Sequence, residues 1–140
     1  MTVLKMTVPG AVVGKARPRV TKHGTYMPKK YVAYLKAVAT MTQWAMKGRT
    51  PFDRPVVLVV DIYNPRPKRK PKTCPEELWS NNAVPCPTKP DADNGLGSIM
   101  DGMEKGGAFT MDSRVHDAHV RTWWCCETGS PRAEIQMSVL

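Results

Sequence analysis

The sequence predicts an α+β fold, with residues 1–140 forming a single two-layer domain in which two main helices cover a mixed four-stranded sheet. Three observations support this prediction. Several segments show strand-type alternation or β-branched runs, and two segments space their apolar residues as helices do. The predicted order is strand, helix, strand, long loop, helix, strand, strand, which suits a sheet with helices on one face. The length and the 41% hydrophobic content suffice for one core.

The first half of the chain predicts a strand followed by a helix. Thr2–Val8 has strand character, and Pro9 and Gly10 end it. Residues 14–19 are basic and rich in proline restraints, which favours an extended segment, and residues 22–25 indicate a turn. A helix then begins near Pro28 and stops near Gly48. Its expected buried face consists of Val32, Leu35, Ala39, Thr42 and Met46.

The second half contains the centre of the predicted sheet. Val56–Tyr63 is apolar at nearly every position, so we expect a central strand buried on both faces. A basic, proline-rich loop is predicted for about residues 64–90, because this stretch has seven prolines and no clean period. The second helix is expected from about Asp93 to Met103, with an apolar face of Leu96, Ile99, Met100 and Met103 and an end at the glycines that follow.

The last segments predict two strands. Val115–Trp124 and Ala133–Leu140 have strand character, and the second alternates apolar with polar residues. Glu127–Pro131 is expected to join them as a hairpin loop.

The charge distribution points to a polyanionic partner. The net charge is +9, and residues 1–50 hold ten Lys or Arg and no Asp or Glu. Six of the twelve acidic residues fall between Asp91 and Asp117. A basic body around an acidic cluster is typical of a protein that binds phosphates and holds a metal ion. The plain alternative, charge for solubility, predicts mixed signs throughout.

Other features restrict the class of protein. No apolar run is long enough to span a membrane and no secretory signal is visible, so we expect a cytoplasmic protein. Disulfides are not expected there. Free thiols are favoured over a structural zinc site, because no CxxC pair is present among Cys74, Cys86, Cys125 and Cys126.

The chemistry is expected at two motifs, KPDADN (residues 89–94) and MDSRV (residues 111–115). Asp91 and Asp93 would share one face of an extended segment, and the chain can return Asp112 to the same place after the second helix. Three aspartates at one point repel each other unless a cation lies between them, and Mg²⁺ prefers such oxygen ligands. The simpler interpretation stays open: Asp91 caps the helix and Asp112 starts a turn.

The combination of KPDADN, IMDGM and MDSRV resembles the core signature of the RusA family of Holliday junction resolvases, in its phage-type branch. The segment GKARPRVTKHGTYMPKKY and the basic insertion before KPDADN resemble that branch too, so the resemblance runs from about Met6 to Val139. It implies a homodimeric, Mg²⁺-dependent endonuclease, with Mn²⁺ as a substitute and no organic cofactor. Such enzymes bind four-way DNA junctions and nick two opposing strands symmetrically, as part of recombination and repair.

The resemblance also implies roles for individual residues. Asp91, Asp93 and Asp112 match the family's three metal-binding, catalytic aspartates, Asn94 matches the asparagine after the second, and Asp101 matches a structural helix aspartate. Two positions depart from the pattern. Gly97 stands where the family has a lysine thought to assist catalysis, and Met111 replaces the first aspartate of a pair. The missing charge is expected from one of three other lysines: Lys15, Lys89 or Lys105.

Basic side chains on either side of the acidic motifs are the expected DNA contacts: Lys15, Arg17, Arg19, Lys22, Lys68, Arg69, Lys70 and Lys89. A catalytic histidine is not required by a hydrated metal, so His23, His116 and His119 are not assigned to the site. Trp123 and Trp124 are interpreted as core and dimer interface rather than as base-stacking residues. Three alternatives remain: a branched-DNA-binding protein with weakened catalysis, a less selective flap or fork nuclease, and a zinc-stabilised DNA-binding protein.

Overall fold

One mixed sheet organises the chain. The computed structural model describes residues 1–72, 74–79, 84–85, 91–125 and 129–140. The strands lie in the order β1 (Thr2–Pro9), β7 (Arg132–Val139), β4 (Val56–Asn64), β6 (Val115–Trp124) and β5 (Val84–Pro85). β4 and β6 are parallel and the other neighbours are antiparallel. The predicted α+β class is confirmed, and the two-residue β5 makes the sheet five-stranded.

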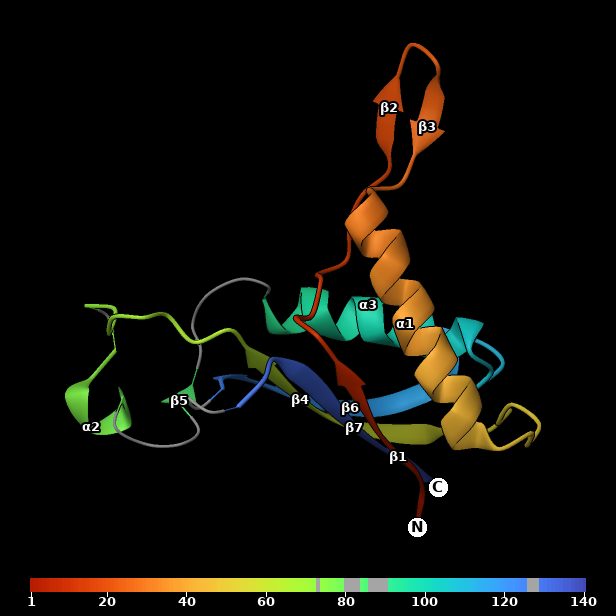
Figure 1. Ribbon diagram of the computed structural model, residues 1–140. Coiled ribbons are helices and arrows are strands. Elements are labelled where there is room, and N and C mark those ends of the chain that lie inside the picture. Colours follow the sequence, from red (N-terminus) through yellow and green to blue (C-terminus); the bar gives the residue numbers. More distant parts are fainter. Residues whose placement is uncertain (73, 80–83, 86–90, 126–128) are drawn as a thin grey trace.

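Two helices cover one face of this sheet (Figure 1). They are α1 (Lys29–Met46) and α3 (Ala92–Lys105), which also pack on each other. α3 lies between the parallel strands β4 and β6 in sequence, as a crossover connection requires. No helix among the described residues is long and apolar enough to cross a membrane.

The core lies between β4 and the helices. Val56, Leu58, Val60 and Ile62 are 0% exposed and point toward them. The residues between them in β4 are only half-buried, so the prediction of burial on both faces is wrong. The sequence predicted burial of both faces because Val57 and Val59 are apolar as well. These two residues lie on the other face of the sheet, which neither helix covers (Figure 1).

The buried face of α1 differs in part from the predicted one. Leu35, Thr42 and Met46 are buried as expected, whereas Val32 is 47% exposed. Tyr31, Tyr34 and Val38 take part instead. The true stripe begins one residue earlier, and both tyrosines present their rings to the interior, a pattern that counting aliphatic residues misses.

The expected hairpin between the last two strands is wrong. β7 pairs with β1 and β4, and β4 lies between β6 and β7 in the sheet. The two strands are adjacent in sequence, which favoured a hairpin. However, β6 pairs with β4 along one edge, and β5 takes the other edge at Trp123 and Trp124, where the hairpin would begin. Part of the connecting segment, residues 126–128, lies outside the described residues.

Residues 64–90 are not wholly irregular. They include a single-turn helix, α2 (Glu76–Trp79), and β5, which pairs with the end of β6. Val84, Cys74 and Trp124 form a small second core, against which Trp79 packs edge-on at 5.8 Å between ring centroids. Trp124 is therefore a core residue, as expected.

A small β-hairpin, β2 (Arg19–Thr21) with β3 (Gly24–Tyr26), precedes α1 and surrounds the predicted turn. All six strand residues are exposed, and the hairpin stands away from the sheet beyond the first turn of α1 (Figure 1). We call it the basic arm, together with Arg17 and Lys22.

Candidate active site

Two of the expected metal ligands lie at the beginning of α3. Asp91 is the N-cap residue in an extended conformation (φ −61°, ψ 155°), and Asp93 lies in the first turn. The helix begins at Ala92, so the pair does not lie on one extended segment as predicted. Both side chains are exposed, and Asp91 makes no capping hydrogen bond. The partial positive charge at a helix N-terminus favours two carboxylates here.

Close packing on the sheet fixes this end of α3. A Cβ atom added at Gly95 would lie 2.6 Å from Cδ1 of Ile62, so the missing side chain lets the helix lie directly against the end of this isoleucine on β4. Ser98 is fully buried and donates to the carbonyl of Gly95 at 3.0 Å. The two aspartates therefore stand on a rigid part of the scaffold, above the end of β4.

Asp112 lies at the opposite end of α3. It begins the 3-10 turn η1 (Asp112–Arg114), and its backbone N–H donates to Oε1 of Glu104 at 2.9 Å. Glu104 follows Asp93 by eleven residues of helix, which is about 16 Å along the axis. The two ends of α3 lie over opposite ends of β4. Gly95 contacts Ile62 near the end of the strand, whereas η1 leads into Val115, which pairs with Val56 at its beginning.

The expected convergence of three aspartates within one chain is therefore wrong. Neither those three nor any other set of three or more Asp, Glu, His or Cys side chains in the described part of the chain gathers into a metal-binding group. Convergence would require the chain to return to the start of α3 after the helix, and it does not. A helix of this length carries the chain away from its first turn, and the parallel β6 begins at the far end.

An ion pair and a hydrogen bond, both to Asp53, hold η1 in place. Asp53 accepts hydrogen bonds from the Thr110 hydroxyl and from Nε of Arg114, both at 2.7 Å. These two donors hold the pKa of the Asp53 carboxyl below its usual range. Asp53 and Glu104 were missed by sequence reasoning, since neither stands near Asp112 in the chain.

Lys15 approaches the face of α3 between the two ends. Its backbone N–H donates to the carbonyl of Asn94 at 3.0 Å, and its Nζ lies 3.4 Å from Oδ2 of Asp101. The same oxygen accepts from the hydroxyl of Tyr31 at 2.8 Å. Burial, followed by this hydrogen bond, raises the pKa of Tyr31 to about 12. Asp101 is thus engaged within the protein.

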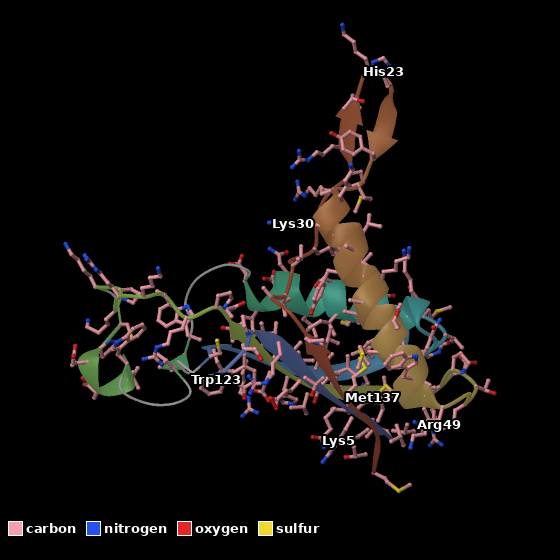
Figure 2. All side chains as sticks on the ribbon, in the orientation of Figure 1. Lys5, His23, Lys30, Arg49, Trp123 and Met137 are labelled. Atoms are coloured by element: carbon pink, nitrogen blue, oxygen red, sulfur yellow. The ribbon has the colours of Figure 1, made fainter. Side chains whose placement is uncertain are left out.

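The basic arm carries its charges at one end of the molecule. Arg17, Arg19 and Lys22 are exposed, and Figure 2 shows His23 at the far tip of the arm, with Lys30 near its base. No acidic residue occurs in the first fifty residues, so this end is uniformly positive.

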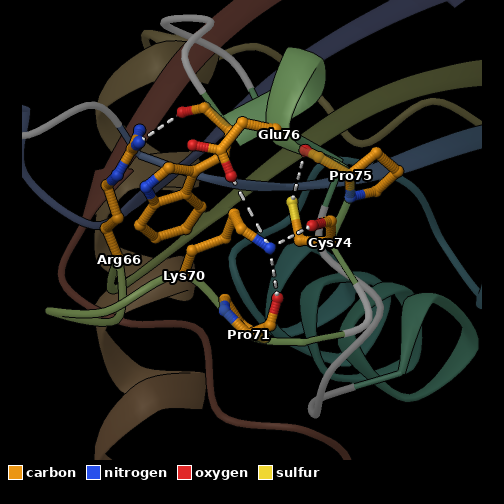
Figure 3. A network of polar contacts seen from close by, with 7 residues as sticks. Arg66, Lys70, Pro71, Cys74, Pro75 and Glu76 are labelled. Atoms are coloured by element: carbon orange, nitrogen blue, oxygen red, sulfur yellow. Dashed lines mark hydrogen bonds and ion pairs between the residues drawn. The ribbon is translucent and has the colours of Figure 1, made fainter.

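The basic residues of the 64–90 region divide into two groups. Lys68 and Arg69 are exposed, whereas Nζ of Lys70 contacts the carbonyl of Cys74 at 2.8 Å and Oε2 of Glu76 at 3.8 Å (Figure 3). Arg66 stacks on the ring of Trp79 at 4.1 Å. Lys70, which was expected to contact DNA, therefore makes contacts within the protein instead of being exposed like its two neighbours. Lys89, like Cys86 and Cys126, lies outside the described residues.

A family comparison covers almost all of this architecture. The family model described as "Endodeoxyribonuclease RusA" matches residues 9–138, which include the basic arm, both ends of α3 and the whole sheet except β1, of which only Pro9 is matched, and the last residue of β7. The chain belongs to the RusA endodeoxyribonuclease family. No curated protein matches the chain.

In this RusA-family chain, Gly97 stands at the position where a lysine was expected, and it leaves the surface of α3 without a side chain of its own there. A Cβ atom at Gly97 would lie 3.2 Å from Cδ of Lys15. A side chain from another segment thus crosses the surface of the helix at this point.

The uncovered face of the RusA-family sheet also carries an ordered polar network that sequence reasoning missed. Asp61 accepts two hydrogen bonds from Arg121, at 2.7 and 2.9 Å, and one from Nε1 of Trp123 at 2.9 Å. The register of β4 and β6 places these residues side by side. The sequence did contain a signal, the single Asp in an otherwise apolar strand. Burial of both faces would have left that carboxylate without a partner, which is costly, so its presence indicates an exposed face.

Proposed function

We propose that this chain is a Mg²⁺-dependent endonuclease that resolves branched DNA, four-way junctions above all, by paired nicks as a homodimer. Membership of an endodeoxyribonuclease family supports the reaction class. The observation that carries the rest is the pair of exposed carboxylates, Asp91 and Asp93, at the start of α3, on a chain whose basic arm is free to bind phosphates.

The donor set at the start of α3 fits Mg²⁺. This ion is usually bound by one or two carboxylates together with waters and substrate phosphate, rather than by a closed protein cage. Asp91 and Asp93 meet that description, because both are exposed and neither side-chain carboxylate is hydrogen-bonded or ion-paired to another described residue. When bound, Mg²⁺ supplies a polarised phosphate and a water of lowered pKa. The two aspartates hold the ion, and the rigid seat on β4 orients them.

Asp112 is assigned to the same reaction across a dimer. Within one chain its backbone is held by the side chain of Glu104, whose own backbone lies about 16 Å along α3 from Asp93, and the three aspartates do not form a metal-binding group. Cutting two opposing strands needs two sites, and a two-fold dimer presents the same residues twice. We therefore assign the third ligand of each site to the partner's Asp112, which is exposed and whose backbone Glu104 holds.

DNA binding is assigned to the basic arm and to the exposed part of the 64–90 region. Arg17, Arg19 and Lys22 contact phosphates from one side, and Lys68 and Arg69 do so from another. An arm whose six strand residues are exposed and pair with each other can adapt to a branch point. Such contacts position the duplex arms without reading sequence.

The test is cleavage of a labelled synthetic four-way junction, beside a linear duplex and a fork, in Mg²⁺ and in EDTA. We expect symmetric nicks in the junction that disappear with EDTA and with Asp93→Asn. Equal rates on all three substrates would replace junction selectivity with general endonuclease activity.

A second candidate function is a branched-DNA-binding protein without cleavage. The distance between Asp112 and the other two aspartates favours it, together with the absent lysine at Gly97. Tight junction binding without cleavage in Mg²⁺ or Mn²⁺ by the dimeric protein would establish this alternative.

A further inference from the structure

Lys15 occupies the surface of α3 that a side chain at position 97 would fill. A Cβ atom at Gly97 would meet Cδ of Lys15 at 3.2 Å, its Cβ at 3.5 Å and its Cγ at 3.9 Å. The backbone of Lys15 is tied to the first turn of the helix through Asn94. The lysine stem therefore leaves the backbone beside this part of the helix, although it comes from the segment before the basic arm.

This place is midway between two carboxylates. Asp93, Gly97 and Asp101 are four residues apart, so they follow one stripe of the helix. Each step along the stripe advances about 6 Å. The ammonium of Lys15 now lies 3.4 Å from Asp101, one step beyond Gly97, and Asp93 stands one step in the other direction. A flexible four-carbon stem anchored between them serves either end.

The contact with Asp101 is easily exchanged. The Lys15 side chain is 53% exposed, and exposed ion pairs contribute little to stability. Asp101 also keeps the hydrogen bond from the Tyr31 hydroxyl when the ammonium leaves. Of the other two lysines considered from the sequence, Lys105 ends α3, far from Asp93, and Lys89 lies outside the described residues.

We propose that Lys15 is a catalytic residue of this site, whose ammonium moves from Asp101 to the phosphodiester bound at Asp91 and Asp93. The inference rests on the proposed function. In hydrolysis, the water oxygen bonds to phosphorus and gives its proton to solvent, while the bond to the leaving strand oxygen breaks and that oxygen takes a proton from solvent. Lys15 donates a hydrogen bond to a non-bridging oxygen, where negative charge is concentrated in the transition state. No proton leaves the lysine.

The test separates charge from packing and binding from rate. Lys15→Met keeps most of the stem and removes the ammonium. Lys15→Met combined with Gly97→Lys returns an ammonium to the same surface, because a helical side chain projects toward the preceding turn, here toward Asp93. Lys5→Met is the matched control, since Lys5 lies exposed on β1 at the opposite end of the molecule from Lys30 (Figure 2).

Two readouts are taken on the dimeric protein with a four-way junction. One is the single-turnover cleavage rate at saturating enzyme in Mg²⁺, and the other is the Kd with Ca²⁺ in place of Mg²⁺. We expect Lys15→Met to lose about 100-fold in rate, the size of effect seen when one oxyanion donor is removed. Its Kd should change by less than about threefold, the double variant should recover at least about tenfold in rate, and Lys5→Met should match the wild type.

Either of two results would overturn the assignment: a Lys15→Met rate within about threefold of the wild type, or no recovery in the double variant despite a normal urea midpoint. A wild-type protein that cleaves none of the substrates would instead remove the proposed function and this inference with it.

Discussion

A methyl group added at Gly102 should loosen the seat of α3, the helix that carries the proposed metal ligands. The new Cβ would lie 2.5 Å from Cβ and 2.6 Å from Cγ1 of Val38, which is fully buried in α1. Rotation cannot relieve a contact between two Cβ atoms, so the helices must separate. Overpacking of this kind costs about 1–3 kcal/mol, and the better helix propensity of alanine returns about 1 kcal/mol. We expect Gly102→Ala to lower the free energy of unfolding by up to about 2 kcal/mol.

Gly97→Ala is the matched control in the same helix. Its new Cβ meets the flexible stem of Lys15 at 3.2 Å, which moves aside, so the variant should gain about 0.5–1 kcal/mol. Urea unfolding at equal protein concentration gives both values, provided that the m-value is unchanged. A Gly102→Ala protein as stable as Gly97→Ala would refute the packing of α1 on α3 described above.

Three further predictions follow from the charges. Substituting Arg17 and Arg19 together by Ala should reduce the slope of log K against log salt for junction binding by about 1.8, since each neutralised phosphate contributes about 0.9; an unchanged slope would exclude both side chains from phosphate contact. The lowered pKa of Asp53 means that its contribution to stability is present above about pH 4 and lost as the pH falls through the folded value, so the difference in urea midpoint between wild type and Asp53→Asn should shrink on acidification. A midpoint difference that is the same at pH 7 and pH 2.5 would contradict this linkage. Mixing Asp93→Asn protein with Asp112→Asn protein should restore part of the cleavage lost by each alone, because one of the two sites in a mixed dimer then has all its ligands; no recovery after subunit exchange would place Asp112 outside the partner's site.

Local patterns predicted most of the fold. The alternation in β7 and the helical spacing before Gly106 depend on neighbours close in sequence, and both elements form as expected. Failures came where a distant partner decides the outcome. β6 and β7 are adjacent in sequence, which predicts a hairpin, but β4 lies between them in the sheet. In α1 the two tyrosines Tyr31 and Tyr34 are buried, which the spacing of aliphatic residues does not predict.

The candidate site was predictable in part for the same reason. Asp91 and Asp93 belong to one motif, so the sequence places them together at the start of a helix. The location of Asp112 depends on the direction in which α3 and β6 run, which a motif does not encode. The sequence alone does not distinguish Lys15 from the other two candidate lysines, because its contact with α3 joins segments about eighty residues apart. The packing of Lys15 against Gly97 identifies it.

The most direct measurement of the central claim uses a supercoiled plasmid that extrudes a cruciform, which is a four-way junction in a closed circle. Paired nicks across the junction by a dimer convert the plasmid to the linear form, whereas a single nick relaxes it to an open circle. We predict linear product in Mg²⁺, none in EDTA, and none with Asp93→Asn. Open circles as the only product, linear product retained by Asp93→Asn, or an uncut plasmid bound tightly by the protein would contradict the account.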